Sequence, residues 1–388
     1  MKLVKIILTM TLAFFLSSGH YLAASSDNLS INSEAAILMD SQSGAILYEK
    51  NANKKLYPAS LTKIATAIYA IEKGNLDDIV TVSSNAVNVE GTKVFLNVGE
   101  QVPLKHLIQG MLINSGNDAA VAIAEHFDGD VEHFSENVNE YLKEKIGAVN
   151  TNFTNPNGLF DTKHYTTAYD LGLITNYALK NTAFKEIFGT KELVWHGESW
   201  NTTLRTHHRL LKGEIPFDKN ITGGKTGYVD ESKQTLATTA SNGRINLTAI
   251  ILKNESKTEI YSETVEMLRY GFDHYQSIQL DSSTIYQANN KKYRLKDDIY
   301  ITESLNGSES LVNKNGQLVI NDELGKPIQS VTLQEIKKHE KPKQPVAKIP
   351  DDHFFRYIVG IILLMIIIGI LLIRRKNPFS SAKVKSYD

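Results

Sequence analysis

The sequence predicts an α+β fold in which one antiparallel sheet is built from both ends of a domain, with helices between them. Two short apolar runs, 35–40 and 45–49, flank a segment of turn composition and predict a β-hairpin. Residues 65 to about 190 are mostly helical in pattern, and short β runs return from Ile221. Strands at both ends of a helical block favour one shared sheet, because each group of strands must bury an apolar face.

The first helix after the hairpin carries a hydroxyl and an amine at its start. Tyr57-Pro58-Ala59-Ser60-Leu61-Thr62-Lys63 runs directly into an apolar stretch over 64–71. Ser60 and Lys63 are three positions apart, so they share one face of a helix. A lysine packed among apolar side chains loses hydration, which lowers its pKa. The pair is a candidate activated nucleophile of the Ser/Lys type, and the alternative is a surface serine beside a solvated lysine.

The remaining elements follow from periodicity. Helices are expected over 102–113, 119–126, 134–146, about 164–179 and 258–270, and strands over 221–228, 235–240 and 247–252. Asn242-Gly243 predicts the turn of the last hairpin. From about 277 to 336 the helical patterns give way to short β runs separated by turn residues, which predicts a small all-β domain.

Both ends of the chain suggest a membrane. Residues 1–24 have a charged start, an apolar run over 6–16 and small residues before Ala24, as a cleaved secretory signal does; an uncleaved anchor is the alternative. Residues 354–373 are predicted to form a short transmembrane helix, since about 20 apolar residues cross a bilayer core. Arg374-Arg375-Lys376 follows and favours a cytoplasmic tail over 374–388, with everything before the helix outside.

These patterns divide the chain into a main domain over 25–275, a β domain over 276–336 and a proline-containing linker over 337–353. The 388 residues are 42% apolar and carry a formal net charge of -1, which suggests two or three folding units and gives no sign of nucleic-acid binding. The chain has no cysteine, so disulfides and thiolate metal sites are excluded. The histidines form no His-Glu-x-x-His pattern, which disfavours a metalloenzyme.

Two later segments carry further chemistry. Ser115-Gly116-Asn117 places a hydroxyl and a carboxamide on a break between two helices, although it is also compatible with a plain turn. Thr222-Gly223-Gly224-Lys225-Thr226-Gly227-Tyr228 is a strand with a cation and a hydroxyl between glycines. Glycines let a ligand backbone approach closely, so Lys225 and Thr226 could hold the anionic end of an extended peptide. The alternative is an edge strand with a protective lysine.

Three motifs occur in the order and spacing of the penicillin-recognising serine enzymes: Ser60-Leu61-Thr62-Lys63, Ser115-Gly116-Asn117 and Lys225-Thr226-Gly227. Over residues 32–275 the chain resembles low-molecular-mass penicillin-binding proteins, the serine-type D-Ala-D-Ala carboxypeptidases of peptidase family S11. Segments 155–159 and 164–171 are also similar to that family. The resemblance implies a β-lactamase/DD-peptidase-like fold, no cofactor, peptidoglycan stem peptides ending in D-Ala-D-Ala as substrates and β-lactams as inhibitors.

The resemblance also implies roles for the site residues. Ser60 attacks the penultimate D-Ala, Lys63 takes its proton, and Ser115 passes a proton to the departing amine. Asn117 holds the peptide's amide, and Lys225-Thr226-Gly227 carries the groups that bind the terminal carboxylate. The backbone N–H groups of Ser60 and Tyr228 form the oxyanion hole.

One departure from the family pattern follows that strand. Where the family continues with Thr and an Ala-Gly pair, this chain has Val229 and then Ser232-Lys233, which leaves substrate preference at this edge open.

Other functions of the same fold remain alternatives. Class A β-lactamases use an added glutamate, and no Glu-x-x-x-Asn lies between Ser115 and Lys225. The motifs do not separate hydrolysis from transpeptidase or endopeptidase activity. A non-catalytic penicillin-binding sensor is disfavoured because all the candidate residues are intact.

Overall fold

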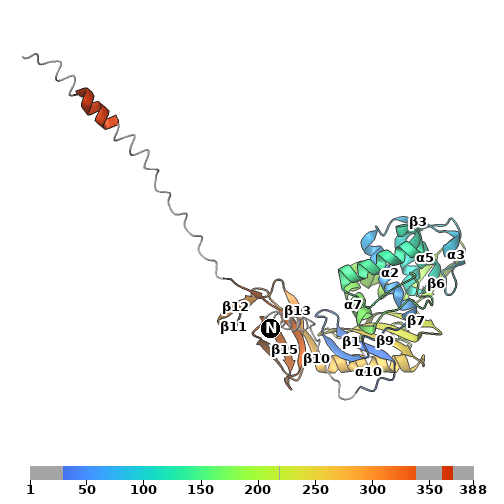
Figure 1. The fold of residues 1–388 in the computed structure, drawn as a ribbon. Helices are drawn as coiled ribbons and strands as arrows, with labels where there is room; N and C mark the ends of the chain where they lie inside the picture. Colours follow the sequence, from blue (N-terminus) through green and yellow to red (C-terminus); the bar gives the residue numbers. More distant parts are fainter. Residues whose placement is uncertain (1–28, 218, 338–360, 370–388) are drawn as a thin grey trace, which may run out of the picture. The chain divides into compact units, whose positions relative to one another are not determined.

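The computed structural model describes residues 29–217, 219–337 and 361–369. Its central sheet has five antiparallel strands in the order β2-β1-β9-β8-β7 (Figure 1). The strands are β1 (Ala35–Asp40), β2 (Ile46–Lys50), β7 (Asn220–Val229), β8 (Lys233–Ser241) and β9 (Asn246–Asn254). Leu38 of β1 pairs with Tyr48 on one side and with Ala249 on the other. The prediction of one sheet assembled from both ends of the domain is therefore correct, and β7 forms its edge.

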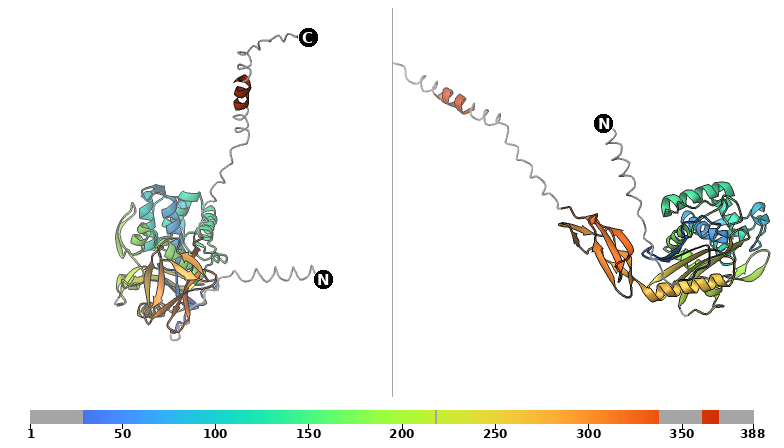
Figure 2. Two further views of the ribbon diagram at one scale, coloured as in Figure 1. Left: turned by 90° about the vertical axis from the view of Figure 1, so that its left-hand side faces the viewer. Right: turned by 60° about the horizontal axis from the view of Figure 1, so that its bottom comes forward.

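The two faces of this sheet support two different cores. Ile37 and Met39 of β1 belong to the core beneath the helical part, whereas Ala36 and Leu38 belong to the core beneath α10 (Glu259–His274). This alternation follows from the period of two along a strand. Figure 2 shows α10 on one side of the sheet and the blue-to-green helices on the other.

The helix that follows the candidate nucleophile runs through the middle of the helical part. This helix, α2 (Thr62–Lys73), is buried from Thr62 to Ala70. Around it lie α4 (Leu104–Ile113), α5 (Asn117–Asp128), α6 (Val131–Tyr141), α7 (Ala168–Ala178) and α8 (Thr182–Phe188).

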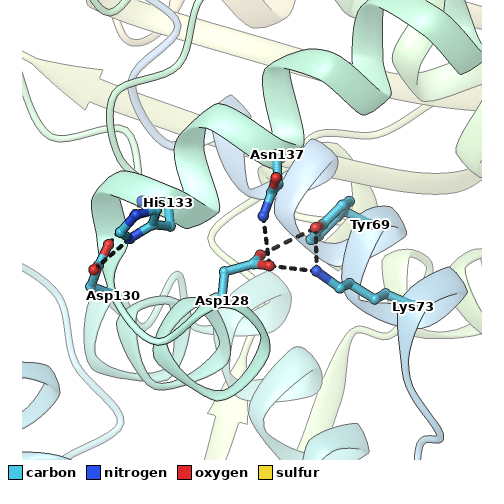
Figure 3. A network of polar contacts seen from close by, with 6 residues as sticks. All are labelled: Tyr69, Lys73, Asp128, Asp130, His133 and Asn137. Atoms are coloured by element: carbon cyan, nitrogen blue, oxygen red, sulfur yellow. Dashed lines mark hydrogen bonds and ion pairs between the residues drawn. The ribbon is translucent and has the colours of Figure 1, made fainter.

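Asp128, at the end of α5, joins α2 to its neighbours (Figure 3). Its carboxylate accepts hydrogen bonds from Tyr69 (3.1 Å), Lys73 (2.5 Å) and Asn137 (2.7 Å). Tyr69 and Lys73 lie on α2, and Asn137 lies on α6. One carboxylate therefore joins three helices at the C-terminal end of α2.

Several predicted boundaries differ from the observed ones. The run predicted as helix from residue 102 begins with β4 (Gln101–Pro103), which pairs with β3 (Ile79–Thr81), so α4 starts only after Pro103. The helix predicted from 134 begins earlier, because Asp130 caps α6 by accepting from the His133 N–H (2.8 Å). Its last turn is a π-helix over Leu142–Ile146.

Several short elements were not predicted, among them α3 (Ser84–Asn88), α9 (Arg209–Lys212) and the hairpin of β5 (Glu192–His196) and β6 (Asn201–Arg205). The hairpin is anchored by Trp195, which is buried against His106 of α4. A tertiary contact of this kind leaves little trace in local periodicity.

Between α10 and Lys337 the regular elements are all strands. They are β10 (Tyr275–Leu280), β11 (Tyr286–Ala288), β12 (Lys291–Arg294), β13 (Ile299–Ser304), β14 (Ser308–Val312), β15 (Gln317–Asp322), β16 (Pro327–Thr332) and β17 (Gln334–Glu335). They share a small core that includes Tyr293, Ile301 and Ile320. Asp40 of the main sheet is fully buried and accepts from Ser277 (2.7 Å) and Thr302 (2.8 Å), which ties β1 to these strands.

The predicted signal peptide (1–24), nearly all of the predicted linker (337–353) and the predicted tail (374–388) lie outside the described residues. Of the predicted membrane helix (354–373), only residues 361–369 are described, and they are helical. No helix in the described part of the chain combines the length and the apolar character needed to cross a membrane.

Candidate active site

A cavity of about 440 Å³ opens between the edge strand β7 and the start of α2. Ser60, Ser115, Thr226, Gly227 and Tyr228 all line it, although they come from three distant segments. Lys63, Asn117 and Lys225 are buried behind this surface. Lys63 donates a hydrogen bond to Asn117, and Lys225 donates one to Ser115. All eight residues singled out from the sequence therefore lie at one place.

A short 3-10 turn, Ala59–Leu61, presents Ser60 just before α2. The Thr62 hydroxyl donates to the Ala59 carbonyl (2.9 Å) and therefore accepts from Nε2 of His164 (2.8 Å). Nδ1 of His164 then accepts from the Thr154 N–H (3.0 Å). Burial lowers the pKa of His164 to about 3, so this imidazole stays neutral and serves as a fixed support for the nucleophile turn.

Gly158 allows a second turn to lie directly against the nucleophile backbone. Its φ is +85°, and a Cβ at this position would stand 1.9 Å from the Ala59 carbonyl oxygen. The turn is held by the Asn155 side chain, which accepts from the Gly158 N–H (2.7 Å). Through this close approach the Asn157 carbonyl reaches Lys63.

The amine of Lys63 has three neighbours. Its Nζ lies 3.0 Å from Ser60 Oγ and donates to Asn117 Oδ1 (2.7 Å) and to the Asn157 carbonyl (2.7 Å). The Asn117 side chain cannot turn its oxygen away, since its Nδ2 donates to the Glu90 carbonyl (2.7 Å).

The environment of Lys63 favours the uncharged amine. Desolvation, assisted by the charge of Lys225, lowers the pKa of Lys63 far below its ordinary value. A neutral amine has two N–H donors, and the two carbonyl-type oxygens occupy both of them. The remaining lone pair then faces the Ser60 hydroxyl, which is the geometry of a general base.

Lys225 and Ser115 form a second hydrogen-bonded group. Nζ of Lys225 donates to Ser115 Oγ (3.0 Å) and to the Thr226 carbonyl (2.7 Å). Burial lowers the pKa of Lys225 to about 7. Ser115 has a φ of +64°, a strained backbone for a residue with a side chain, at the break between α4 and α5.

Gly227 brings the edge strand close to the nucleophile. A Cβ on Gly227 would lie 2.9 Å from the Ser60 nitrogen and 2.4 Å from Thr235 Oγ1, so a larger residue would push β7 away. Tyr228, the next residue, is half exposed at the mouth of the cavity. Two backbone N–H groups, of Ser60 and of Tyr228, are thus placed on opposite walls of the same cavity.

The departure from the family pattern lies in the turn between β7 and β8. Ser232 is buried, and its hydroxyl accepts from the Val229 N–H (3.1 Å) and donates to the Lys233 carbonyl (2.9 Å). Lys233 has a φ of +52°, in the region that glycine occupies most easily. The Ser232 hydroxyl therefore stabilises this turn by bonding to backbone groups at both of its ends.

Sequence reasoning missed four residues that shape the site. Asn157 and His164 lie in segments that resemble the family, but no role was assigned to them. Asp118 is fully buried and accepts from the N–H groups of Val94 (3.0 Å) and Leu96 (3.2 Å), which fixes the loop above the cavity.

The fourth is His207, which lines the cavity, while His208 is fully buried beneath β7. The side chain is exposed by surface area, but desolvation by the surrounding protein first, and then the charges of Lys225, Lys212 and Lys257, lower the pKa of His207 to about 4. No local pattern distinguished it from other histidines.

Comparison with known proteins agrees with this geometry. A family model described as D-alanyl-D-alanine carboxypeptidase, peptidase S11, matches residues 22–256. The chain belongs to this family. One relative, D-alanyl-D-alanine carboxypeptidase DacF from Bacillus subtilis, is 31% identical over 317 residues, which cover 78% of this chain and 79% of DacF. DacA from Haemophilus influenzae is 32% identical over 64% of each chain.

Solved structures of the family have the same fold. Penicillin-binding protein 5 from Haemophilus influenzae superposes with a TM-score of 0.70 and 26% identity, covering 81% of this chain and 99% of that structure. A mutant of the Streptomyces K15 DD-transpeptidase gives a TM-score of 0.59 and 26% identity over 63% of this chain and 99% of that one. The predicted mixed α/β DD-peptidase fold is therefore confirmed.

Proposed function

We propose that this protein is a serine-type D-Ala-D-Ala carboxypeptidase that removes the terminal D-Ala from peptidoglycan stem peptides through an acyl-enzyme on Ser60. The observation that carries the proposal is the environment of Lys63. A fully buried amine with two fixed acceptors directs its lone pair at a serine hydroxyl in a cavity. This arrangement supplies a nucleophile and its base in contact before substrate arrives.

The reaction has two steps. Lys63 takes the Ser60 proton while Ser60 Oγ bonds to the carbonyl carbon of the penultimate D-Ala, and the N–H groups of Ser60 and Tyr228 stabilise the oxyanion. The tetrahedral intermediate collapses as the C–N bond breaks. The departing amine of the terminal D-Ala takes the hydroxyl proton of Ser115, and the proton that Lys63 took from Ser60 replaces it on Ser115. Water then attacks the ester, which releases the shortened peptide and returns the proton to Ser60.

Substrate selection follows from the positive end of the cavity. The terminal carboxylate binds to Lys225 and Thr226. The amide-binding role expected for Asn117 does not fit the free enzyme, because its Oδ1 accepts from Lys63 and its Nδ2 donates to the Glu90 carbonyl. A β-lactam presents a carboxylate and a strained amide in the same relation, so it acylates Ser60 in place of the peptide. Lys225 is half charged near pH 7 in the free enzyme, and the arriving carboxylate favours its charged form.

The ends of the sequence support an extracellular location. The charged and apolar start of residues 1–24 is that of a secretory signal. The apolar run over 354–373, followed by Arg374-Arg375-Lys376, would anchor the chain with its catalytic domain outside and its tail in the cytoplasm. Peptidoglycan lies on that side of the membrane.

Residues 25–352 should release D-Ala from a peptide ending in D-Ala-D-Ala and bind a labelled penicillin covalently. Ser60→Ala should lose both activities, whereas Ser84→Ala, which changes an exposed serine on α3, should keep both. Retention of penicillin labelling by Ser60→Ala would show that the nucleophile is elsewhere. Rapid turnover of penicillin without D-Ala release would instead identify a β-lactamase.

A further inference from the structure

A second cavity, of about 230 Å³, is lined by residues that flank the catalytic segments in sequence. Tyr57 lines it three positions before Ser60, and Glu231 lines it three positions after Tyr228. Three residues of extended chain span at most about 11 Å, so both walls lie close to the reacting atoms. The two segments that leave the catalytic cavity therefore enclose the second one.

The following inference rests on the proposed function, which defines the direction in which the substrate peptide lies along β7. If the terminal carboxylate lies at Lys225 and the scissile carbonyl lies at the Tyr228 N–H, the peptide runs antiparallel to β7. Its upstream residues then pass Tyr228 toward the turn that contains Glu231. The Cα of the residue directly before the penultimate D-Ala is only 3.8 Å from the next Cα. A long side chain on that residue can enter the second cavity.

The cavity contains charges of both signs. Lys55 and Lys253 are its cations, and Glu231 is its anion. Among the described residues, neither lysine has a carboxylate within ion-pair distance, and the Lys55 ammonium instead lies 4.3 Å from the centre of the Tyr165 ring. Both lysines are thus available to an incoming carboxylate.

The backbone at Lys253 is held in an unusual conformation. Its φ is +58°, although it lies within β9 and carries a side chain. Such a conformation costs free energy unless surrounding structure enforces it, and residues of this kind cluster at binding sites.

We propose that this cavity binds the side chain of the stem-peptide residue that precedes the two D-Ala residues, and that it selects a side chain ending in both an ammonium and a carboxylate group. Lys55 and Lys253 bind the carboxylate, Glu231 binds the ammonium, and Tyr57 and Tyr165 form the walls. A side chain that ends in an ammonium group alone leaves two cations unmatched. The cavity thus acts as a specificity site upstream of the cleaved bond.

The test uses three peptides that end in D-Ala-D-Ala and differ only at that side chain. One ends in ammonium and carboxylate, one carries the same group with the carboxylate amidated, and one is lysine. The wild-type protein should show a KM about tenfold lower for the first peptide, a change typical of one charge-assisted contact, with similar kcat for all three. Lys55→Met/Lys253→Met should raise the KM of the first peptide to that of the amidated one. Glu231→Gln should raise the KM of the first peptide as well.

Lys54→Met is the matched control, because Lys54 is adjacent in sequence but forms its ion pair with Glu34. It should keep the full preference, and thermal melting checks the folding of each variant. Equal KM values for the three peptides with the wild-type protein would overturn the proposed site while leaving the carboxypeptidase function intact. An unchanged KM in Glu231→Gln would overturn selection of the ammonium. Absence of D-Ala release from every peptide would instead refute the proposed function.

Discussion

Replacing Gly158 by alanine should slow acylation of Ser60 although it alters none of the reacting side chains. The new Cβ would stand 1.9 Å from the Ala59 carbonyl oxygen, whereas real Cβ atoms essentially never come closer than 3.0 Å. Relief of the clash therefore moves one backbone segment by at least 1.1 Å relative to the other. Both segments carry the site, since one presents Ser60 and the other supplies the Asn157 carbonyl to Lys63.

A misplacement of about 1 Å in a catalytic group costs on the order of 10²-fold in rate. We therefore expect Gly158→Ala to acylate with labelled penicillin about 10²-fold more slowly than the wild-type protein. Single-turnover kinetics at saturating penicillin measures this step directly. The expected change is in the acylation rate, because the displaced segments carry Ser60 and the Asn157 carbonyl that holds Lys63.

Gly147→Ala separates the clash from the cost of the backbone conformation. Gly147 has a φ of +84°, almost the same as Gly158, but a Cβ there meets nothing within 4 Å. Both variants should lose about 1–2 kcal/mol of stability from the left-handed conformation. Only Gly158→Ala should lose acylation rate. A folded Gly158→Ala protein that acylates as fast as Gly147→Ala would refute the reasoning.

Three further predictions follow. Lys63→Met should slow acylation by about 10²–10⁴-fold, the usual contribution of a general base, and a loss under tenfold in the same assay would assign the base elsewhere. For peptides with a free terminal carboxylate, kcat/KM should fall as the pH rises past about 7, because Lys225 then loses its charge in the free enzyme; a flat profile to pH 9 would contradict this. Asp128→Ala should lower the free energy of unfolding by about 1–3 kcal/mol, since it leaves the donors of α2 and α6 without their acceptor. His133→Ala, at an exposed pair in the same region (Figure 3), should have a smaller effect in the same denaturant titration.

Regular elements with strong periodicity were predicted well. The hairpin of β1 and β2, the buried helix α2 and the meander of β7, β8 and β9 all occur where the apolar spacing places them. The β5–β6 hairpin was missed because Trp195 stabilises it through a contact with α4, about ninety positions earlier in the chain. The boundaries of α4 and α6 were wrong where a short strand pairing and an aspartate cap decided the start of a helix.

Prediction of the candidate site residues depended on local sequence spacing and on contacts between distant segments. The spacing of Ser60 and Lys63 on one helical face is local, so the sequence is sufficient for it. Asn157 and His164 were visible as members of similar segments, but their roles arise from contacts with Lys63 and Thr62. His207 and the charged cavity of Lys55, Glu231 and Lys253 become apparent only when distant segments are brought together.

The sequence by itself determined the fold class, the order of the chemical groups along the chain and the family. Only the tertiary structure decided which groups meet and in which protonation state. Lys63 contacts Asn117 and Asn157, which are 54 and 94 positions away, and Lys225 contacts Ser115, 110 positions away. Desolvation and hydrogen-bond partners set the pKa of a buried lysine, and both are supplied by residues remote in sequence. A serine and a lysine one helical turn apart become a nucleophile and its base only inside that assembled cavity.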